Sequence, residues 1–132
     1  MNLLRRTLYW QAAVWALVGA ALAAAPHLVL VDLLSQRFLA DYAWVRLVGA
    51  QAVGLALLMV LVGQRIEELW WWSWAFVITT AAVTTIALMN ALFSVPSHSA
   101  AWPWWLFTGI GLAFAVALLW GMARAGNERP PA

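Results

Sequence analysis

Arg46 has the clearest capacity for binding chemistry in this chain, because it is a cation just inside a long apolar segment, AWVRLVGAQAVGLALLMVLVG. The planar guanidinium suits paired oxygen atoms, such as those of an anionic headgroup, a substrate carboxylate or a quinone. The side chain also has a simpler interpretation, since its long stem can carry the charge to the surface of a bilayer. Arg46 is therefore either a surface anchor or the centre of a ligand site.

Asn90 and His27 are the side chains that such a ligand site would include. If successive apolar segments cross a bilayer in alternating directions, Arg46, Asn90 and His27 reach the same membrane face. His98 reaches that face as well, and two histidines there also suggest a haem, pigment or metal ligand set. They have no fixed spacing, and a metal would need further ligands. We therefore expect no metal and no resident cofactor, with pigment, haem and quinone left open as alternatives.

Gln51 lies deeper in the same segment, where an amide without a hydrogen-bond partner would cost several kcal/mol. We expect it to turn inward, and Thr80 and Thr84 of the next apolar segment lie at matching depth. The sequence thus predicts a buried polar tie between helices. A permeation path is the alternative, although such paths usually carry an intramembrane Asp, Glu or His.

Catalytic constellations are missing from the sequence. There is no cysteine, and the paired acids Glu67 and Glu68 stand in a short polar turn, GQRIEEL. No nucleophile and base can be paired from these residues. We expect that the protein is not an enzyme.

The elements that position these residues follow from composition. The 132-residue chain is 66% hydrophobic and 9% charged, whereas soluble domains are about 45–50% apolar and about 25% charged. The apolar segments at about 8–25, 43–63, 69–93 and 102–123 are each long enough to cross a bilayer. The sequence predicts an all-α integral membrane four-helix bundle, formed by a single transmembrane domain over residues 1–132.

Orientation follows from the arginines. They concentrate before the first segment, in the second connection and after the fourth segment, at Arg5, Arg6, Arg65, Arg124 and Arg129. The positive-inside rule places both termini in the cytoplasm. Tryptophans near both ends of the spans, including WWWSW at 70–74, predict interfacial belts, with a cofactor-stacking box as the alternative. The start of the chain imitates a secretory signal, but we expect an uncleaved helix because the apolar segment is long and Pro26 follows the candidate cleavage position.

The connection at 26–42 is half apolar. Leu28, Val31, Leu34 and Phe38 recur at roughly helical spacing, which predicts a short amphipathic helix at the membrane interface between the first two spans. An ordinary loop is the alternative.

Small residues at intervals of about four predict faces on which helix backbones approach closely. They occur in the first, second and fourth segments, at Ala12, Ala16, Ala20, Gly49, Ala50, Gly54, Gly111 and Ala115. The pattern does not separate contacts within the bundle from contacts with another protein.

The order of AAAPHLVLVDLL, VRLVGAQAVGLALLMVLVGQR and two further apolar segments resembles small bacterial four-helix inner-membrane proteins that are loosely grouped with DoxX-like families. Its local signature is Pro26, Arg46, Gly49 and Gly54. The resemblance implies a multi-pass protein of the bacterial inner membrane and transfers no catalytic residue.

Two functions remain. The first is a small accessory or structural subunit that packs against a larger membrane protein complex or forms a homo-oligomer. The second is a bundle that binds or transports a lipid, a quinone or a small amphiphile near Arg46. The net charge of +2 comes from scattered arginines, so we expect contact with membrane lipids and no nucleic-acid partner.

Overall fold

Four long helices dominate the computed structural model, which describes residues 2–36, 41–94 and 100–128. They are α1 (Asn2–Ala24), α2 (Ala43–Gln64), α4 (Ser73–Met89) and α5 (Trp102–Glu128). Shorter pieces are η1 (Leu28–Leu33), α3 (Ile66–Leu69), η2 (Trp70–Trp72) and η3 (Asn90–Ser94). Counting α3 to η3 as one helical stretch, four stretches are long and apolar enough to cross a membrane. The expected all-α, four-span membrane architecture is confirmed.

Local sequence explains where the helices start and stop. A continuous helix satisfies its own backbone N–H and C=O groups, which hydrocarbon requires. Helix α1 ends at Ala24, just before Pro26, whose ring has no N–H and restricts the residue before it. At the start of α2, the side chain of Asp41 accepts a hydrogen bond of 2.9 Å from the backbone N–H of Ala43.

The predicted helical piece between the first two spans is present as η1, a single π-helical stretch. Leu28 and Leu33 are exposed on it, whereas Val31 and Leu34 are half-buried. Phe38 lies outside the described residues. Leu28 and Leu33 are thus the apolar side chains of η1 that are available to lipid.

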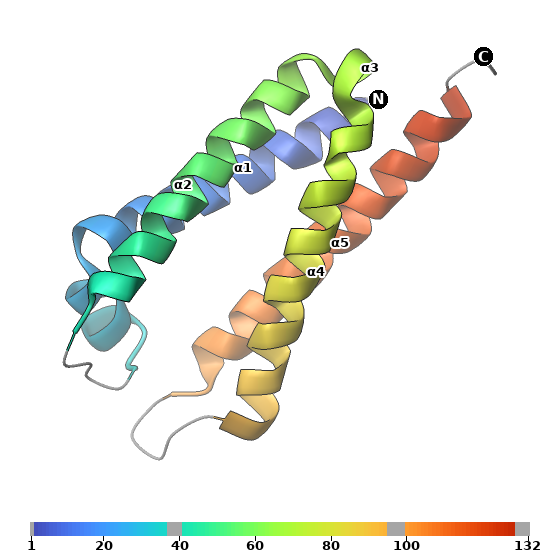
Figure 1. Cartoon of the computed structure of the whole chain (residues 1–132). Coiled ribbons are helices and arrows are strands. Elements are labelled where there is room, and N and C mark those ends of the chain that lie inside the picture. The colour runs from blue at the N-terminus through green and yellow to red at the C-terminus, as the bar shows by residue number, and fades with distance from the viewer. Residues whose placement is uncertain (1, 37–40, 95–99, 129–132) are drawn as a thin grey trace.

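The helices form two hairpins, α1 with α2 and α4 with α5, and the hairpins meet where α1 packs on α5 (Figure 1). We call the end that holds residue 2, α3 and residue 128 the terminal end. The end that holds residues 25–36 and 100–102 is the loop end. Helix α2 is an outer helix, because its extensive packing is against α1.

The core lies in the terminal half of the bundle. It contains Leu4, Leu8, Ala12, Ala56, Met59, Val62, Ile66, Trp70, Phe76, Val77, Leu118, Met122 and Ala125. Towards the loop end the two hairpins diverge (Figure 1). A hydrogen-bonded contact bridges them there, because the backbone N–H of Ala100 donates to the carbonyl oxygen of Ser35 at 3.0 Å, and Gln36 Nε2 donates to the carbonyl oxygen of Ala100 at 3.0 Å.

Glycines bring helix backbones into direct contact. A Cβ atom at Gly49 of α2 would lie 2.5 Å from the carbonyl oxygen of Gly19 and 2.7 Å from the backbone nitrogen of Ala23, both in α1. Gly121 of α5 makes a similar approach, since its added Cβ would lie 3.0 Å from the Cα of Leu4. Close backbone approach of this kind is the usual basis of helix association in lipid.

The predicted small-residue positions divide into two groups. Five of them are buried or half-buried, namely Ala12, Ala16, Gly49, Gly111 and Ala115. The other three, Ala20, Ala50 and Gly54, are exposed in the single chain, so they do not serve the internal packing of the bundle. Spacing could not separate the groups, because a small residue looks the same on a covered face and on an uncovered face. The pattern also missed Gly19, the partner of Gly49.

Replacing Gly49 with Ala should destabilise the protein by about 1–3 kcal/mol, because the added methyl group has no room against Gly19. The measurement is the free energy of unfolding in detergent micelles, followed by helical circular dichroism. Gly109→Ala in the fourth span is the matched control, since an added Cβ there meets no atom of the described chain within 4 Å. Equal stability of the two variants would contradict the packing described here.

Candidate functional site

The residues of the expected ligand site lie at the loop end but are not all brought together. Arg46 is exposed on α2, and Asn90 is half-buried at the start of η3. Within the described residues no hydrogen bond or ion pair joins Arg46 to Asn90. These elements belong to different hairpins and are well apart at this end (Figure 1). Asn90 and Arg46 thus have no direct contact in the part of the chain that the structure describes, and their shared ligand site stays a prediction.

His27 is exposed next to η1, and its ring meets the ring of Tyr42 edge-on, with the ring centroids 5.8 Å apart. The pair joins the end of the first span to the start of the second. His98 lies outside the described residues. Among residues 2–36, 41–94 and 100–128, no group of three His, Cys, Asp or Glu side chains is placed to hold a metal ion.

The buried polar contact between helices is made by Gln11, not by Gln51. Gln11 is fully buried in α1, and its Nε2 donates a hydrogen bond of 2.6 Å to Thr80 Oγ1 of α4. The expectation that Gln51 would turn inward to Thr80 is wrong, because Gln51 is exposed on α2 and Thr80 accepts its hydrogen bond from Gln11. The general inference of an amide bonded to a threonine across helices holds, with a different amide.

Sequence reasoning missed Gln11 although a signal was available. Gln11 follows Leu4 and Leu8 by seven and three positions and precedes Ala12, so it shares the face that proves to be buried. A polar residue on the most regular packing face of a span is expected to have a partner on the opposing helix.

Three buried polar atoms of the described chain have no hydrogen-bond partner, namely Gln11 Oε1, Ser73 Oγ and Thr84 Oγ1. Thr84 Oγ1 lies directly against the Cα of Gly111 in α5, at a site that an added Cβ would occupy. Thr84, the third residue of the predicted polar contact, thus packs α4 against α5 and is not bonded to Gln51. Other threonines bond within their own helix, as Thr85 does to the carbonyl oxygen of Ala81 at 2.8 Å.

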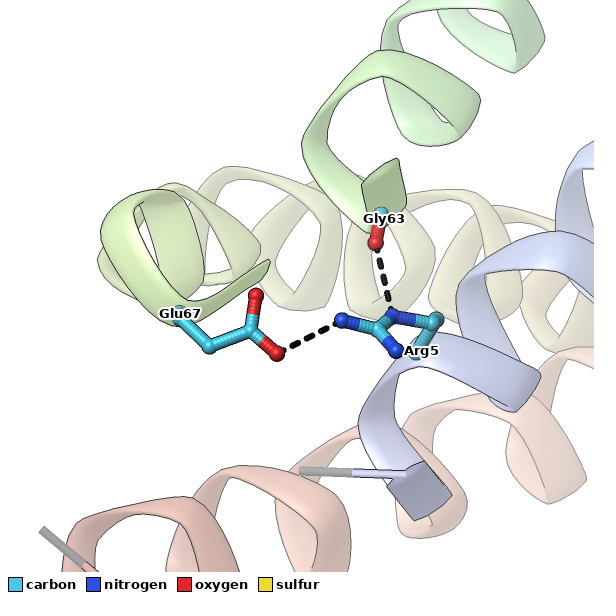
Figure 2. Close-up of polar contacts among 3 residues, drawn as sticks. All are labelled: Arg5, Gly63 and Glu67. Atoms are coloured by element: carbon cyan, nitrogen blue, oxygen red, sulfur yellow. Dashed lines mark hydrogen bonds and ion pairs between the residues drawn. The ribbon is translucent and has the colours of Figure 1, made fainter. Parts of the chain in front are cut away.

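The terminal end is held by Arg5. Its Nε donates to the carbonyl oxygen of Gly63 at 3.0 Å, and one of its terminal nitrogens pairs with Glu67 Oε1 at 2.7 Å (Figure 2). Gly63 lies in the last turn of α2, where carbonyl groups lack helical partners and a cation is favourable. Arg65 and Glu68 form a looser pair of 3.7 Å within the turn. Arg5 therefore joins the start of α1 to the end of α2 and the turn that follows.

Most of the tryptophans lie near the ends of the spans, whereas Trp10 and Trp15 lie within α1, and Trp10 is 71% exposed there. Trp71, Trp72 and Trp120 are exposed towards the terminal end, and Trp44 and Trp102 are exposed towards the loop end. Trp70 differs, because it is buried in the core and stacks on Trp71 with ring centroids 4.4 Å apart. The expectation that every indole of WWWSW belongs to the interfacial belt is wrong for Trp70, since the helix turns it inward against the core.

Gln51 is the polar group of the spans that most needs an explanation. It lies about 12 Å along α2 from Ala43 and about 20 Å from Gln64, at about 1.5 Å per residue, and it is exposed. An amide that faces hydrocarbon alone costs several kcal/mol. Beside it, Ala50 and Gly54 are exposed as well. Together these residues form an uncovered face of α2 with both small side chains and an unsatisfied amide.

Helical architecture, composition and buried apolar contacts define a four-span helical membrane protein. No protein-family model, curated protein or solved structure matches the chain. The DoxX-like resemblance thus stays a prediction.

Replacing Thr80 with Val should lower the free energy of unfolding by about 0.6–2 kcal/mol, because Gln11 loses its hydrogen-bond partner in the core. Unfolding in micelles measures the change. Thr85→Val is the matched control, as that hydroxyl is exposed and bonds to its own helix. In a chain that already carries Gln11→Leu, Thr80→Val should lower the free energy of unfolding by less. Strictly additive losses of stability from the two substitutions would contradict a direct bond.

Replacing Arg5 with Met should lower the free energy of unfolding by about 1 kcal/mol. The Gly63 carbonyl would lose a charged donor, and Glu67 would lose its ion-pair partner. Arg65→Met, which breaks only the looser local pair, should change stability little. Unfolding at low and high salt separates the two contributions, since salt screens the exposed ion pair. Indistinguishable effects of the two substitutions would show that Arg5 does not join the helices.

Proposed function

We propose that this protein is a small integral membrane interaction subunit, an accessory or structural partner of a larger membrane protein complex. The observation that carries the proposal is the exposed amide of Gln51 within α2. In hydrocarbon such a group is stable when another helix supplies a hydrogen-bond partner. Ala50 and Gly54 beside it leave room for that helix to approach closely.

The interior supports a scaffolding role. Its polar contacts are the Gln11–Thr80 hydrogen bond and packed hydroxyl groups, which hold helices together without acid–base chemistry. This supports a role for the outer surface of the bundle, whose shape the core maintains.

We also propose that both termini face the cytoplasm of a bacterium, with the protein in the inner membrane. Exposed Arg6, Arg65 and Arg124 stand towards the terminal end, and Arg46 stands towards the loop end. The arginine excess supports a cytoplasmic terminal end by the positive-inside rule.

A second candidate function is binding or transport of a lipid, quinone or small amphiphile at the loop end. It is favoured by Arg46, which is exposed and forms no ion pair within the described residues. A planar guanidinium at that depth suits an anionic headgroup or a carbonyl oxygen.

The test is native mass spectrometry after extraction from the native membrane in a mild detergent. We expect a stoichiometric membrane protein on the wild-type chain and its loss from Gln51→Leu. Thr85→Val is the control, because it removes an exposed hydroxyl from α4 and leaves α2 unchanged. A partner that survives Gln51→Leu would contradict the proposed contact. If the chain instead carries only a small molecule of constant mass, and Arg46→Ala loses it, the ligand-binding function would be favoured.

A further inference from the structure

The uncovered face of α2 has the spacing of a helix-pairing seam. Among the exposed residues of α2, six recur at alternating intervals of three and four positions, namely Trp44, Leu47, Gln51, Gly54, Leu58 and Leu61. This is the a/d repeat by which two helices interlock side chains at a crossing angle of about 20°. We name these six residues the α2 seam.

The seam lies opposite the face that α2 uses inside the bundle. Ala56 and Gly49 are buried against α1, and Gly54 is about 160° around the helix from Ala56 at about 100° per residue. An added Cβ at Gly54 meets no atom of the chain within 4 Å. A second helix can thus approach the seam without displacing α1.

We propose that the α2 seam is a homodimer interface, in which α2 of a second copy packs in parallel around a two-fold axis along the membrane normal. Two copies inserted in the same orientation place Gln51 opposite Gln51 at one depth. A carboxamide has both a donor NH2 and an acceptor oxygen, so two of them can bond to each other reciprocally. The second copy therefore supplies the polar group that the exposed amide lacks.

The rest of the seam fits this partner. Leu47, Leu58 and Leu61 are 38–58% exposed and would interlock with their equivalents. Gly54 lies one turn from Gln51, where a missing side chain lets the two backbones come close enough for the amides to meet. One polar position among apolar positions also sets the register of a helix pair.

The inference rests on the proposed function, because both require the face of α2 around Gln51 to be a protein contact. It assigns that face to a second copy, so a larger partner would contact the dimer through another surface. The two can fail separately, since one concerns a copy of this chain and the other concerns a different protein.

Cysteine cross-linking in native membranes tests the dimer, and the chain has no cysteine of its own. Single variants Gly54→Cys and Leu58→Cys should form disulfide-linked dimers on mild oxidation. The controls are Val48→Cys and Leu57→Cys, because these positions are 56% and 62% exposed on α2 but lie off the seam. We expect much weaker linking there. Equal linking at all four positions, or none at Gly54 and Leu58, would overturn the proposal.

A second measurement tests the amide and the close approach. Dissociation of the dimer in micelles, followed by energy transfer between labelled chains, should become about three- to tenfold easier in Gln51→Leu. Gly54→Leu should abolish the dimer, and Gly109→Leu should not, although Gly109 of α5 is equally open. Unchanged association in Gln51→Leu would overturn the role of the amide pair.

Comparison with native mass spectrometry separates the two proposals. Seam cross-links without any larger partner would leave the dimer standing and remove the accessory function. A different protein held through Gln51, with no seam cross-links, would overturn the dimer and leave the proposed function intact. A monomer with neither would overturn both.

Discussion

Close approach of helix backbones is the interaction on which this structure depends. Lipid tails are as apolar as leucine, so the helices gain little from hydrophobic burial and must rely on tight fit and hydrogen bonds. Gly19 and Gly49 meet this requirement by bringing α1 and α2 into backbone contact. Gly121 does the same for α5 against α1, whereas Gly111 of α5 packs against the side chain of Thr84 in α4. Helix α1 thereby packs against α2 of its own hairpin and against α5 of the other hairpin, so it lies at the centre of the bundle.

Two glutamines within the spans, Gln11 and Gln51, differ in burial. Gln11 is fully buried and bonds to Thr80, so it adds a directional contact between the two hairpins. Gln51 has the same side chain at a comparable distance within its helix and is left on the surface. The cost of an unpaired amide in hydrocarbon is the same for both. An internal contact explains the first, and the external contact that we propose would explain the second.

The distribution of packing supports this division of roles. The terminal half of the bundle contains the core and the Arg5 contacts with Gly63 and Glu67. Towards the loop end the hairpins diverge, and the contact of Ser35 and Gln36 with Ala100 bridges them. Helix α2 lies at the edge of this arrangement, and one of its faces is not covered by the described residues. The same fold thus gives a firm core and a surface available to a partner.

Composition and apolar length were enough to predict an all-α protein with four spans, because a stretch of about 20 apolar residues has few alternatives to a membrane helix. The helical piece after Pro26 was also foreseen from its spacing. The sequence did not predict which helix faces are covered by other helices. Ala12 and Ala20 lie on one four-residue repeat, yet the first is buried and the second is exposed. The inward amide is Gln11 and not Gln51. Periodicity defines the faces of a helix, whereas the order in which helices pack around one another decides which faces meet. That order depends on the mutual fit of distant glycines such as Gly19 and Gly49, and only the tertiary structure reveals it.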